Sequence, residues 1–477
     1  MQYQQRFIRV FISSTFSDMM PEREYAARVI FEEFLGLKYC LIRHDDDHWR
    51  LTDSEEKRSL IMPDVFFAKA REYWLGLESL PKQPLPTWNV ASDLSDLVLV
   101  KPDLPIIAGV THLDGAWFFR SADNTILLGI DVIGSAFFML SRYEEVVKPD
   151  RDEHDRFPAL ASLACQESFL DRPIVDEYVE LLWVVMKRLW PTLERRRHEY
   201  CLTLTHDVDD PFGVKGQTWG RIIRRLGRDL IRLRDPALAV RHMRSLLIPG
   251  EAGDNLDPNN NFDWIMDQSE GYGLRSKFYF MVGDTNKEYD DGYDIFASRL
   301  QRLLRRIHER GHIIGLHPSY DTLDRPNLLL TEVEKLRQAL EKAGVDQIVQ
   351  SGRQHYLRWR ADRTWADWEN AGLKEDSSVG FAEHAGFRTG TCRAYPVWSL
   401  ADSKPLKLIE KSLVIMERSL LSEQYMNLSL EQAGFVITRL VSAVKLFKGN
   451  MVVLWHNDHF LDPVATCLYY NLLKEGV

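Results

Sequence analysis

The sequence predicts an α/β protein with two units: a parallel sheet or (β/α) barrel over residues 199–477, and an additional α/β domain over residues 1–198. Three observations predict this division. Strand, loop and helix patterns alternate regularly after residue 199, which is typical of parallel sheets and barrels. Before it, short strands mix with amphipathic helices. The charged stretch 194–199 between the two regions has the composition of a linker, and 477 residues suffice for two or three domains.

The N-terminal region contains three predicted strands and three predicted helices. The strands are apolar runs at residues 8–12, 97–100 and 126–128. The helices, in which apolar residues recur every three or four positions, cover residues 21–34, 131–145 and 174–190. The first of them begins with proline and has acids in its first turn, as is usual at a helix N-terminus.

The second region repeats a strand-then-helix pattern. Strands are predicted at residues 202–205, 276–281, 313–316, 347–351, 406–415 and 451–455. Helices are predicted at residues 293–310, 332–343, 364–370 and 430–447. In such folds the loops that follow the strands carry the chemistry, so the side chains at these strand ends are the candidates for function.

Two insertions interrupt this pattern. Residues 215–244 hold nine basic against two acidic residues, with several arginines at helical spacing. This segment is either a solvated helix face or a docking surface for an anionic substrate, a lipid phosphate or an acidic partner. Residues 249–261, rich in Gly, Asp, Asn and Pro, are predicted to be a flexible loop at the rim.

Composition excludes some classes of protein. Lys and Arg number 60 against 70 Asp and Glu, and a formal charge of -10 argues against a general nucleic-acid binder.

No apolar run approaches the roughly 18 residues of a transmembrane helix, and the N-terminus lacks the apolar centre of a signal peptide. We therefore expect a soluble, cytoplasmic protein. Five dispersed cysteines without CxxC spacing predict neither a zinc knuckle nor a disulfide framework.

Two segments carry the strongest chemical signal. Asp207 and Asp209 follow an apolar strand, and His317 and Asp321 follow another. Of two such aspartates, one can bind a divalent metal while the other takes a proton from water. His317 and Asp321, four residues apart, can share one face of a helical turn and bind a first-row metal. Taken singly, each is also compatible with a buried histidine or with carboxylates that cap turns.

Three further strand ends add polar side chains. Arg353 and Tyr356 follow the first of these strands, and arginine there can keep a carboxylate ionised or bind an anion. Asp376 follows the second. His456 ends the third, and its ordinary pKa near neutrality suits protonation of a leaving group.

In this order the motifs resemble those of the polysaccharide deacetylase (NodB-homology) superfamily, carbohydrate esterase family four. The strings THDVD, GLHPSYDT, GRQHYLRW, DSSVGF and LWHN carry the resemblance, which covers about residues 200–477. FEEFLGL and FFMLSRYEE resemble stretches in the extra N-terminal domain of one bacterial branch. The resemblance implies a distorted (β/α) barrel that removes acetyl groups from N- or O-acetylated sugars with a divalent metal.

The same resemblance implies a role for each motif residue. Asp207 matches the catalytic base, Asp209 and His317 match metal ligands, and Arg353 matches the arginine that keeps the base ionised. Tyr356 matches the residue whose backbone N–H helps to form an oxyanion hole. His456 matches the general acid, and Asp376 the carboxylate that orients it.

One position departs from the family pattern. Asp321 stands where the family has a second histidine ligand. The set Asp209, His317 and Asp321 can bind zinc, manganese or iron, but a carboxylate in place of imidazole weakens the preference for soft ligands and also permits a metal-free site. Of these metals, we expect zinc to be the one that the site binds.

We therefore expect a hydrolase of an acetylated sugar in a polysaccharide or glycoconjugate. Two alternatives stay open: a C–N hydrolase of the same fold acting on a non-sugar amide, and an inactive sugar-binding protein. The start of the chain, VFISSTF at residues 10–16, also resembles a TIR-like domain over about fifteen residues. The sequence leaves the oligomeric state open.

Overall fold

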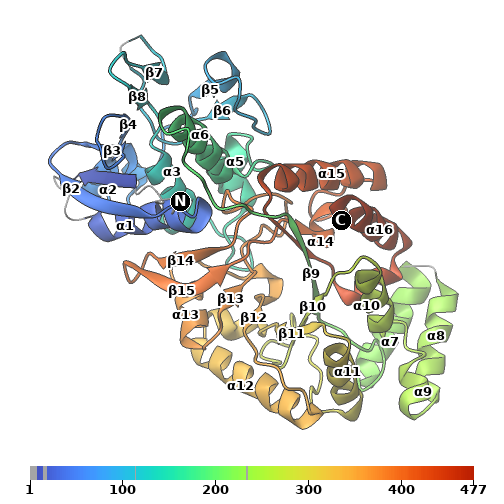
Figure 1. Cartoon of the computed structure of the whole chain (residues 1–477). Coiled ribbons are helices and arrows are strands. Elements are labelled where there is room, and N and C mark those ends of the chain that lie inside the picture. The colour runs from blue at the N-terminus through green and yellow to red at the C-terminus, as the bar shows by residue number, and fades with distance from the viewer. Residues whose placement is uncertain (1–7, 14–18, 113, 233–234) are drawn as a thin grey trace, which may run out of the picture.

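A computed structural model of the chain describes all residues except 1–7, 14–18, 113 and 233–234. Residues 14–16 of the VFISSTF stretch therefore lie outside the described residues. The protein is a mixed α/β structure with two large sheets, one built from residues before 130 and one from residues after 200 (Figure 1). Within the part of the chain that is described, no helix is both long and apolar enough to cross a membrane.

The N-terminal sheet has six strands in the order β2-β1-β3-β4-β8-β7 and mixes parallel and antiparallel pairs. Its strands are β1 (Ile8–Ser13), β2 (Tyr39–His44), β3 (His48–Thr52), β4 (Ser59–Pro63), β7 (Phe118–Arg120) and β8 (Thr125–Leu128). A separate pair joins β5 (Thr87–Asn89) to β6 (Asp103–Pro105). The strand predicted at 97–100 is wrong: Val98 is exposed, and the Val100 N–H donates to a carboxylate oxygen of Glu177.

Helices of this region pack against the sheet and against the second region. They are α1 (Met20–Arg28), α2 (Val65–Glu72), α3 (Val132–Leu140), α4 (Tyr143–Val147), α5 (Leu163–Gln166) and α6 (Ile174–Leu189). α1 continues as a wider π-helical segment over Val29–Phe34, so the predicted helix 21–34 is confirmed in extent. The predicted helix 131–145 is broken between α3 and α4, where Arg142 has a left-handed backbone with φ of 56°.

The second sheet has nine strands in the order β14-β15-β13-β12-β11-β10-β9-β17-β16. They are β9 (Cys201–Val208), β10 (Lys277–Phe280), β11 (Ile313–Leu316), β12 (Ser351–Gly352), β13 (Glu375–Asp376), β14 (Tyr395–Ser399), β15 (Lys404–Glu410), β16 (Ile415–Met416) and β17 (Asn450–Leu454). All neighbouring pairs are parallel except β14 with β15. β9 is buried along most of its length, as expected for a parallel strand covered on both faces.

The predicted strand 406–415 is two strands, β15 and β16, at distant places in this order. Seven strand spacings of about 4.8 Å would separate them by roughly 34 Å in a flat sheet. The few residues between Glu410 and Ile415 reach only about 17 Å. The sheet must therefore curl so that its ends approach. No backbone ladder between β15 and β16 closes a ring among the described strands, so the predicted barrel closure is not observed.

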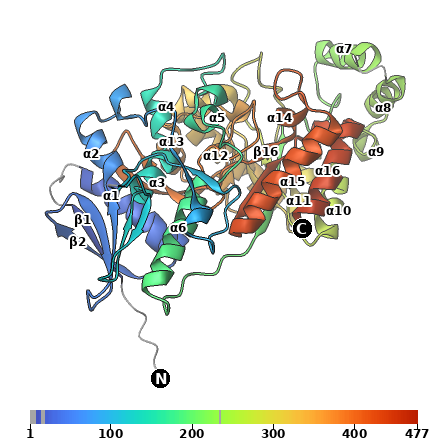
Figure 2. The same cartoon turned by 90° about the horizontal axis from the view of Figure 1, so that it is seen from above.

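In Figure 2 the light-green helices project from the edge of the molecule. The second region contains helices along its whole length. They are α7 (Trp219–Gly227), α8 (Pro236–Leu247), α9 (Gly250–Asp254), α10 (Phe262–Gly271), α11 (Ser298–Glu309), α12 (Pro326–Ala343), α13 (Thr364–Asn370), α14 (Glu417–Leu421), α15 (Leu430–Phe447) and α16 (Pro463–Gly476). α15 begins with a capping box between Ser429 and Gln432, and α12 starts with proline and ends at Gly344 with φ of 72°. The segment 249–261, predicted as a flexible loop, contains α9 and the buried Asn259.

The two regions share one hydrophobic cluster. Side chains from both belong to the same buried set, which runs from Ile8 to Leu408 in the sequence. At the contact, the Tyr25 hydroxyl donates to the Pro396 carbonyl at 2.8 Å, and the Tyr395 hydroxyl donates to the Leu140 carbonyl at 3.0 Å. The linker residues 194–199 form no helix or strand.

Candidate active site and metal centre

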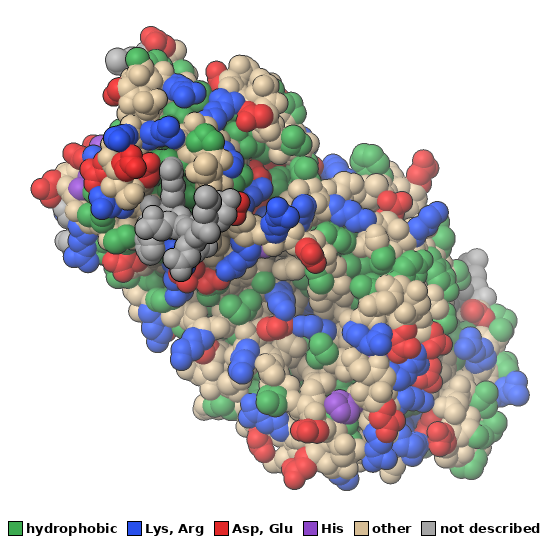
Figure 3. Space-filling model, viewed as in Figure 1, with side chains coloured by type: hydrophobic (Ala, Val, Ile, Leu, Met, Phe, Trp, Pro, Cys, Tyr) green, Lys and Arg blue, Asp and Glu red, His purple; other side chains and the backbone are tan. Residues whose placement is uncertain are grey.

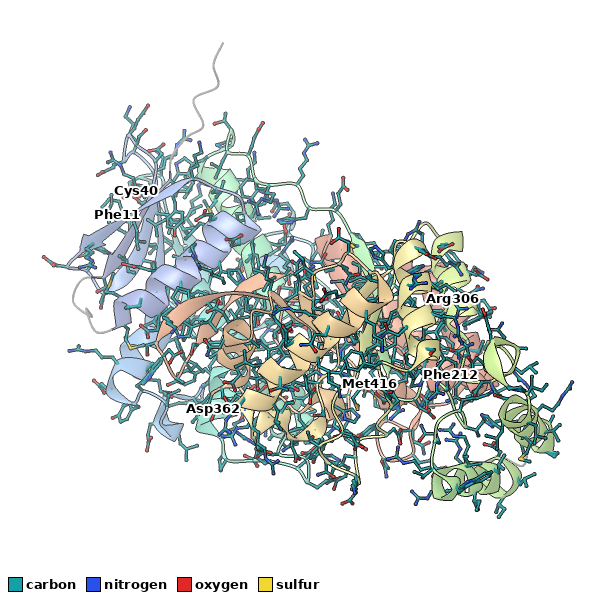
Figure 4. The ribbon with its side chains drawn as sticks, turned by 90° about the horizontal axis from the view of Figure 1, so that it is seen from below. Phe11, Cys40, Phe212, Arg306, Asp362 and Met416 are labelled. Atoms are coloured by element: carbon teal, nitrogen blue, oxygen red, sulfur yellow. The ribbon has the colours of Figure 1, made fainter. Side chains whose placement is uncertain are left out.

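The parallel strands bring most of the predicted site residues to one small pocket. Asp207 lies on β9 with Asp209 just beyond it, His317 follows β11, Arg353 follows β12, and His456 follows β17. The pocket has a volume of about 60 Å³, room for about two water molecules or a small acyl group. It is lined by Arg156, Asp207, Asp209, His317, His355, Tyr356, Leu357, Ala382, Met416, Arg418, Tyr425, Leu454 and His456. Figure 4 shows Met416, one of these residues, in the body of the second region.

Three buried side chains in this pocket form a candidate metal site. Asp209, His317 and His355 each offer one ligand atom, and these atoms lie within 4.8 Å of one another. His317 Nε2 is 3.2 Å from Asp209 Oδ1, and His355 Nε2 is 3.9 Å from the same oxygen. Two imidazoles with one carboxylate are a ligand set for zinc or for iron, and manganese is compatible with it.

Two further contacts orient the imidazoles. His317 Nδ1 donates to the Arg353 carbonyl at 2.7 Å, and His355 Nδ1 lies 3.0 Å from an Asp290 carboxylate oxygen. Each contact fixes the ring and leaves Nε2 free on the pocket side, which is the arrangement typical of metal-binding histidines.

Two of the three candidate ligand atoms face each other without a well-formed hydrogen bond. Asp209 Oδ1 and His317 Nε2 are both buried and 3.2 Å apart, and neither has a hydrogen-bond partner of good geometry within the described part of the chain. A buried polar atom without a partner carries a desolvation penalty of about 1–3 kcal/mol, so such atoms usually have a ligand. The residues present therefore fit a divalent metal.

Asp321 lies outside this group. It sits in a 3₁₀ turn over Tyr320–Leu323, where its Oδ1 is 3.5 Å from the Asn286 amide nitrogen and its Oδ2 is 3.8 Å from Arg325. The turn directs the carboxylate to these partners instead of to Asp209. His355 lies three residues after the end of β12. It takes the place in the candidate ligand set that the sequence had suggested for Asp321.

Asp207 is held by an arginine, as predicted. Arg353 Nη1 donates to Asp207 Oδ1 at 2.9 Å and to Thr205 Oγ1 at 2.8 Å. The guanidinium is fully buried, and its Nε also donates to the Ser377 carbonyl. Asp207 Oδ2 lies 3.8 Å from His317 Nε2, so this carboxylate adjoins the candidate metal site. The Arg353 guanidinium thus holds the Asp207 carboxylate in place beside the candidate metal ligands.

His456 is oriented by Glu417, a residue that the sequence had not singled out. Its Nδ1 lies 2.6 Å from Glu417 Oε1, and its Nε2 is 3.8 Å from Asp209 Oδ2. Burial and the Arg418 guanidinium oppose protonation of His456, but the Glu417 and Asp209 carboxylates outweigh them and raise its pKa. Burial alone would raise the pKa of Glu417, but His456 and His459 hold it at about 2. The pair thus favours an imidazolium facing the pocket.

Asp376 does not contact His456. Its Oδ1 accepts hydrogen bonds from the backbone N–H and the hydroxyl of Ser378, at 2.9 and 2.5 Å. Burial raises its pKa to about 6. The carboxylate that contacts His456 is therefore that of Glu417 and not that of Asp376. Glu417 directly follows β16, the second of the two strands into which the predicted strand 406–415 divides.

The pocket carries additional positive charge. Arg418 Nη2 is 3.8 Å from Asp209 Oδ2 and 3.5 Å from an Asp458 oxygen. Burial acts to raise the pKa of Asp209, but His317, His355 and His456 lower it well below its ordinary value. Asp209 is therefore ionised, and its negative charge can bind a cation.

Tyr356 lines the pocket on a strained backbone. Its φ and ψ of 60° and 11° are left-handed, a conformation uncommon for a residue with a side chain and often found at functional sites. Arg156, from the N-terminal region, donates from Nη1 to the Tyr356 carbonyl at 2.9 Å. The N-terminal region thus supports one wall of the pocket directly.

Comparisons with known proteins do not assign a function to the chain. Residues 12–191 match a family model described as a family of unknown function, DUF7033. No curated protein matches the chain.

Three solved structures share a weak likeness. A presumed polysaccharide deacetylase from Mycobacterium smegmatis has 13% identity and a TM-score of 0.36, with 58% of this chain and 84% of that one covered. The Xyl-CE4 domain of a multidomain xylanase from the hindgut metagenome of Trinervitermes trinervoides has 13% identity and a TM-score of 0.26, covering 58% and 81%. A Puue allantoinase has 9% identity and a TM-score of 0.35, covering 58% and 84%. TM-scores at this level do not assign an activity.

Proposed function

We propose that the protein is a metal-dependent hydrolase that removes acetyl groups from an N- or O-acetylated sugar, with its site in residues 199–477. One observation carries the proposal. An arginine-paired carboxylate, a two-histidine and one-aspartate ligand set and a carboxylate-paired histidine all face one pocket of about 60 Å³. These are the groups that hydrolysis of an acyl bond needs: a base, an electrophile site and an acid.

The chain's own residues divide the reaction between them. Asp207, held in place by Arg353, accepts a proton from the attacking water. Asp209, His317 and His355 would hold a divalent metal, which when bound supplies Lewis-acid polarisation of the acyl carbonyl and acidifies water. His456, held by Glu417, donates a proton to the departing amine or alcohol. Tyr356, on its strained turn, offers its backbone N–H to the developing oxyanion.

The size of the pocket fits an acetyl group. Its volume of about 60 Å³ corresponds to about two water molecules, and four apolar side chains line it beside the polar groups: Leu357, Ala382, Met416 and Leu454.

The test is acetate release from acetylated oligosaccharides by the zinc-loaded protein, compared with Asp207→Asn. The variant keeps the side-chain shape and the metal ligands but loses the base. We expect it to bind zinc like the wild type and to lose at least about a hundredfold in kcat/KM. An Asp207→Asn protein with unchanged activity would refute the assigned base. Release of ammonia or ring opening of a cyclic amide, without acetate, would indicate the C–N hydrolase alternative, and metal binding with no hydrolysis a binding protein.

A further inference from the structure

A helical hairpin formed by α7 and α8 presents apolar side chains to solvent. On α7 and its π-helical continuation, Trp219, Ile223 and Leu230 are 72%, 68% and 52% exposed. Their spacing of four and seven residues places them on one stripe of the helix. Figure 2 shows α7 and α8 projecting from the edge of the molecule.

The second helix of the hairpin carries an apolar stripe of its own. Val240, Met243 and Leu247 of α8 are 56%, 39% and 72% exposed, and their spacing of three and four residues again forms one stripe. Single exposed apolar residues are ordinary, but six on two consecutive helices mark an interaction surface. Figure 3 shows hydrophobic and basic side chains side by side along this edge of the molecule.

Basic side chains accompany the apolar stripes. Arg224, Arg241 and Arg244 are exposed, and none has an ion-pair partner among the residues that the structure describes. The two acids of the hairpin are engaged internally: Asp229 is buried 2.7 Å from His242 Nδ1, and Asp235 accepts a hydrogen bond from the Leu238 N–H at the start of α8. The exposed surface of the hairpin is therefore apolar and positively charged.

From this combination we infer that the hairpin docks on an anionic membrane surface. A helix with one apolar stripe and arginines beside it lies in the interface of a bilayer, with its apolar side chains among the lipids and its cations near anionic headgroups. A second copy of this chain fits less well, because a symmetric contact would bring the arginines of both copies together. The absence of a membrane-spanning helix among the described residues is compatible with docking at the surface.

The hairpin is joined to the pocket side of the protein. Arg225 forms an ion pair with Asp210, the residue after the predicted ligand Asp209, and Arg221 Nη2 donates to the carbonyl of Asp290 at 3.2 Å. Asp290 in turn contacts His355. The contacts of the hairpin thus reach the loop that orients His355, and, on the proposed function, the substrate would be an acetylated glycan attached to a membrane.

The experiment is flotation of the purified full-length protein with vesicles, which needs no enzymatic activity. Vesicles of phosphatidylcholine mixed with phosphatidylglycerol are compared with vesicles of phosphatidylcholine alone, at low and high salt. We expect the wild type to float with the anionic vesicles and to be released by salt. Substituting the α7 stripe, Trp219→Ser with Ile223→Ser and Leu230→Ser, removes only exposed side chains and should weaken binding at least about tenfold.

A second variant tests the charges and a third serves as control. Arg224→Glu with Arg241→Glu and Arg244→Glu should weaken binding on the order of a hundredfold, because each basic residue near an anionic surface contributes about a factor of five. The control replaces equally exposed apolar residues elsewhere, Leu77→Ser with Leu160→Ser and Phe435→Ser, which are 64%, 70% and 67% exposed. It should bind like the wild type.

Three results would overturn the inference: no flotation of the wild type with anionic vesicles, flotation that neither hairpin variant weakens, or a stable dimer by light scattering that the α7 variant converts to a monomer. The last would identify the surface as a contact between copies. Failure of acetate release with intact vesicle binding would refute the proposed function alone.

Discussion

His355 shows how one residue changes the chemistry inferred for a site. Sequence spacing pointed to Asp321 as the third ligand because it stands four residues after His317. The structure turns Asp321 toward Asn286 and Arg325 and brings His355 to His317 and Asp209 instead. The candidate ligand set therefore has two imidazoles, which suits zinc better than one imidazole with two carboxylates.

At the same scale, Glu417 sets the proton affinity of His456. Replacing Glu417 by Gln removes the buried negative charge that favours the imidazolium, so the pKa of His456 should fall. Because His456 acts as an acid, kcat/KM decreases as the pH rises through this pKa. We expect the decrease to begin at lower pH in Glu417→Gln than in the wild type.

The measurement is the pH dependence of kcat/KM for acetate release by both proteins. His456→Ala is the reference for complete loss of the acid and should reduce kcat/KM about 10²–10⁴-fold. A Glu417→Gln profile that overlies the wild-type profile would show that Glu417 does not control the acid.

At the scale of elements, the chain after the break between α3 and α4 connects the two regions through Glu145. Arg142 and Arg388 both contact the buried Glu145: Arg142 Nε donates to Oε1 at 2.8 Å, and Arg388 Nη2 donates to Oε2 at 2.6 Å. All three side chains are almost fully buried. The left-handed Arg142 is therefore needed to place Glu145 between two guanidinium groups from different regions.

Glu145→Ala should lower the free energy of unfolding by about 3–5 kcal/mol, because it leaves the buried Arg388 guanidinium without a carboxylate and Arg142 with Glu144 alone. Urea unfolding followed by circular dichroism measures the change. Glu153→Ala is the matched control, since Glu153 has a side chain that is 82% exposed, and it should change stability by no more than about 0.5 kcal/mol. Equal stabilities of the two variants would contradict this role for Glu145.

For the whole molecule, the sequence predicted the strand-and-helix alternation of residues 199–477 well. Helices 364–370 and 430–447 and strand 313–316 have the predicted bounds, because each is a local pattern with its own start and stop signals. The sequence also singled out Asp207, Asp209, His317, Arg353 and His456, because each ends or follows an apolar strand. The structure brings these residues to the same pocket or to its wall, and their roles stay predictions.

Long-range placement could not be predicted. The split of β15 from β16 depends on how the sheet curls, and Glu417 becomes a candidate only once β16 is known to end beside β17. His355 lies in the string GRQHYLRW, so the sequence already shows an imidazole close to the end of a predicted strand, which is a signal for a site residue. Its convergence with His317 depends on the turn after β12, which local pattern does not determine.

The shared core leads to a prediction about the two regions. Trp398 is fully buried against Tyr25, with ring centroids 5.1 Å apart, and Tyr395 is also fully buried at this contact. We propose that residues 1–198 and 199–477 are separate in topology but depend on each other for stability. Residues 199–477 expressed alone should aggregate, since they would expose these aromatic side chains. A soluble fragment with cooperative thermal unfolding would show instead that the second region is independent.

We propose that Asp209, His317 and His355 bind one catalytic metal beside Asp207. Crystals grown with zinc would reveal the ion by anomalous diffraction. We predict one zinc peak within about 2.0–2.2 Å of an Asp209 oxygen and of Nε2 of both histidines. No peak in this pocket, or a zinc ion held by Asp321 without His355, would refute this ligand set.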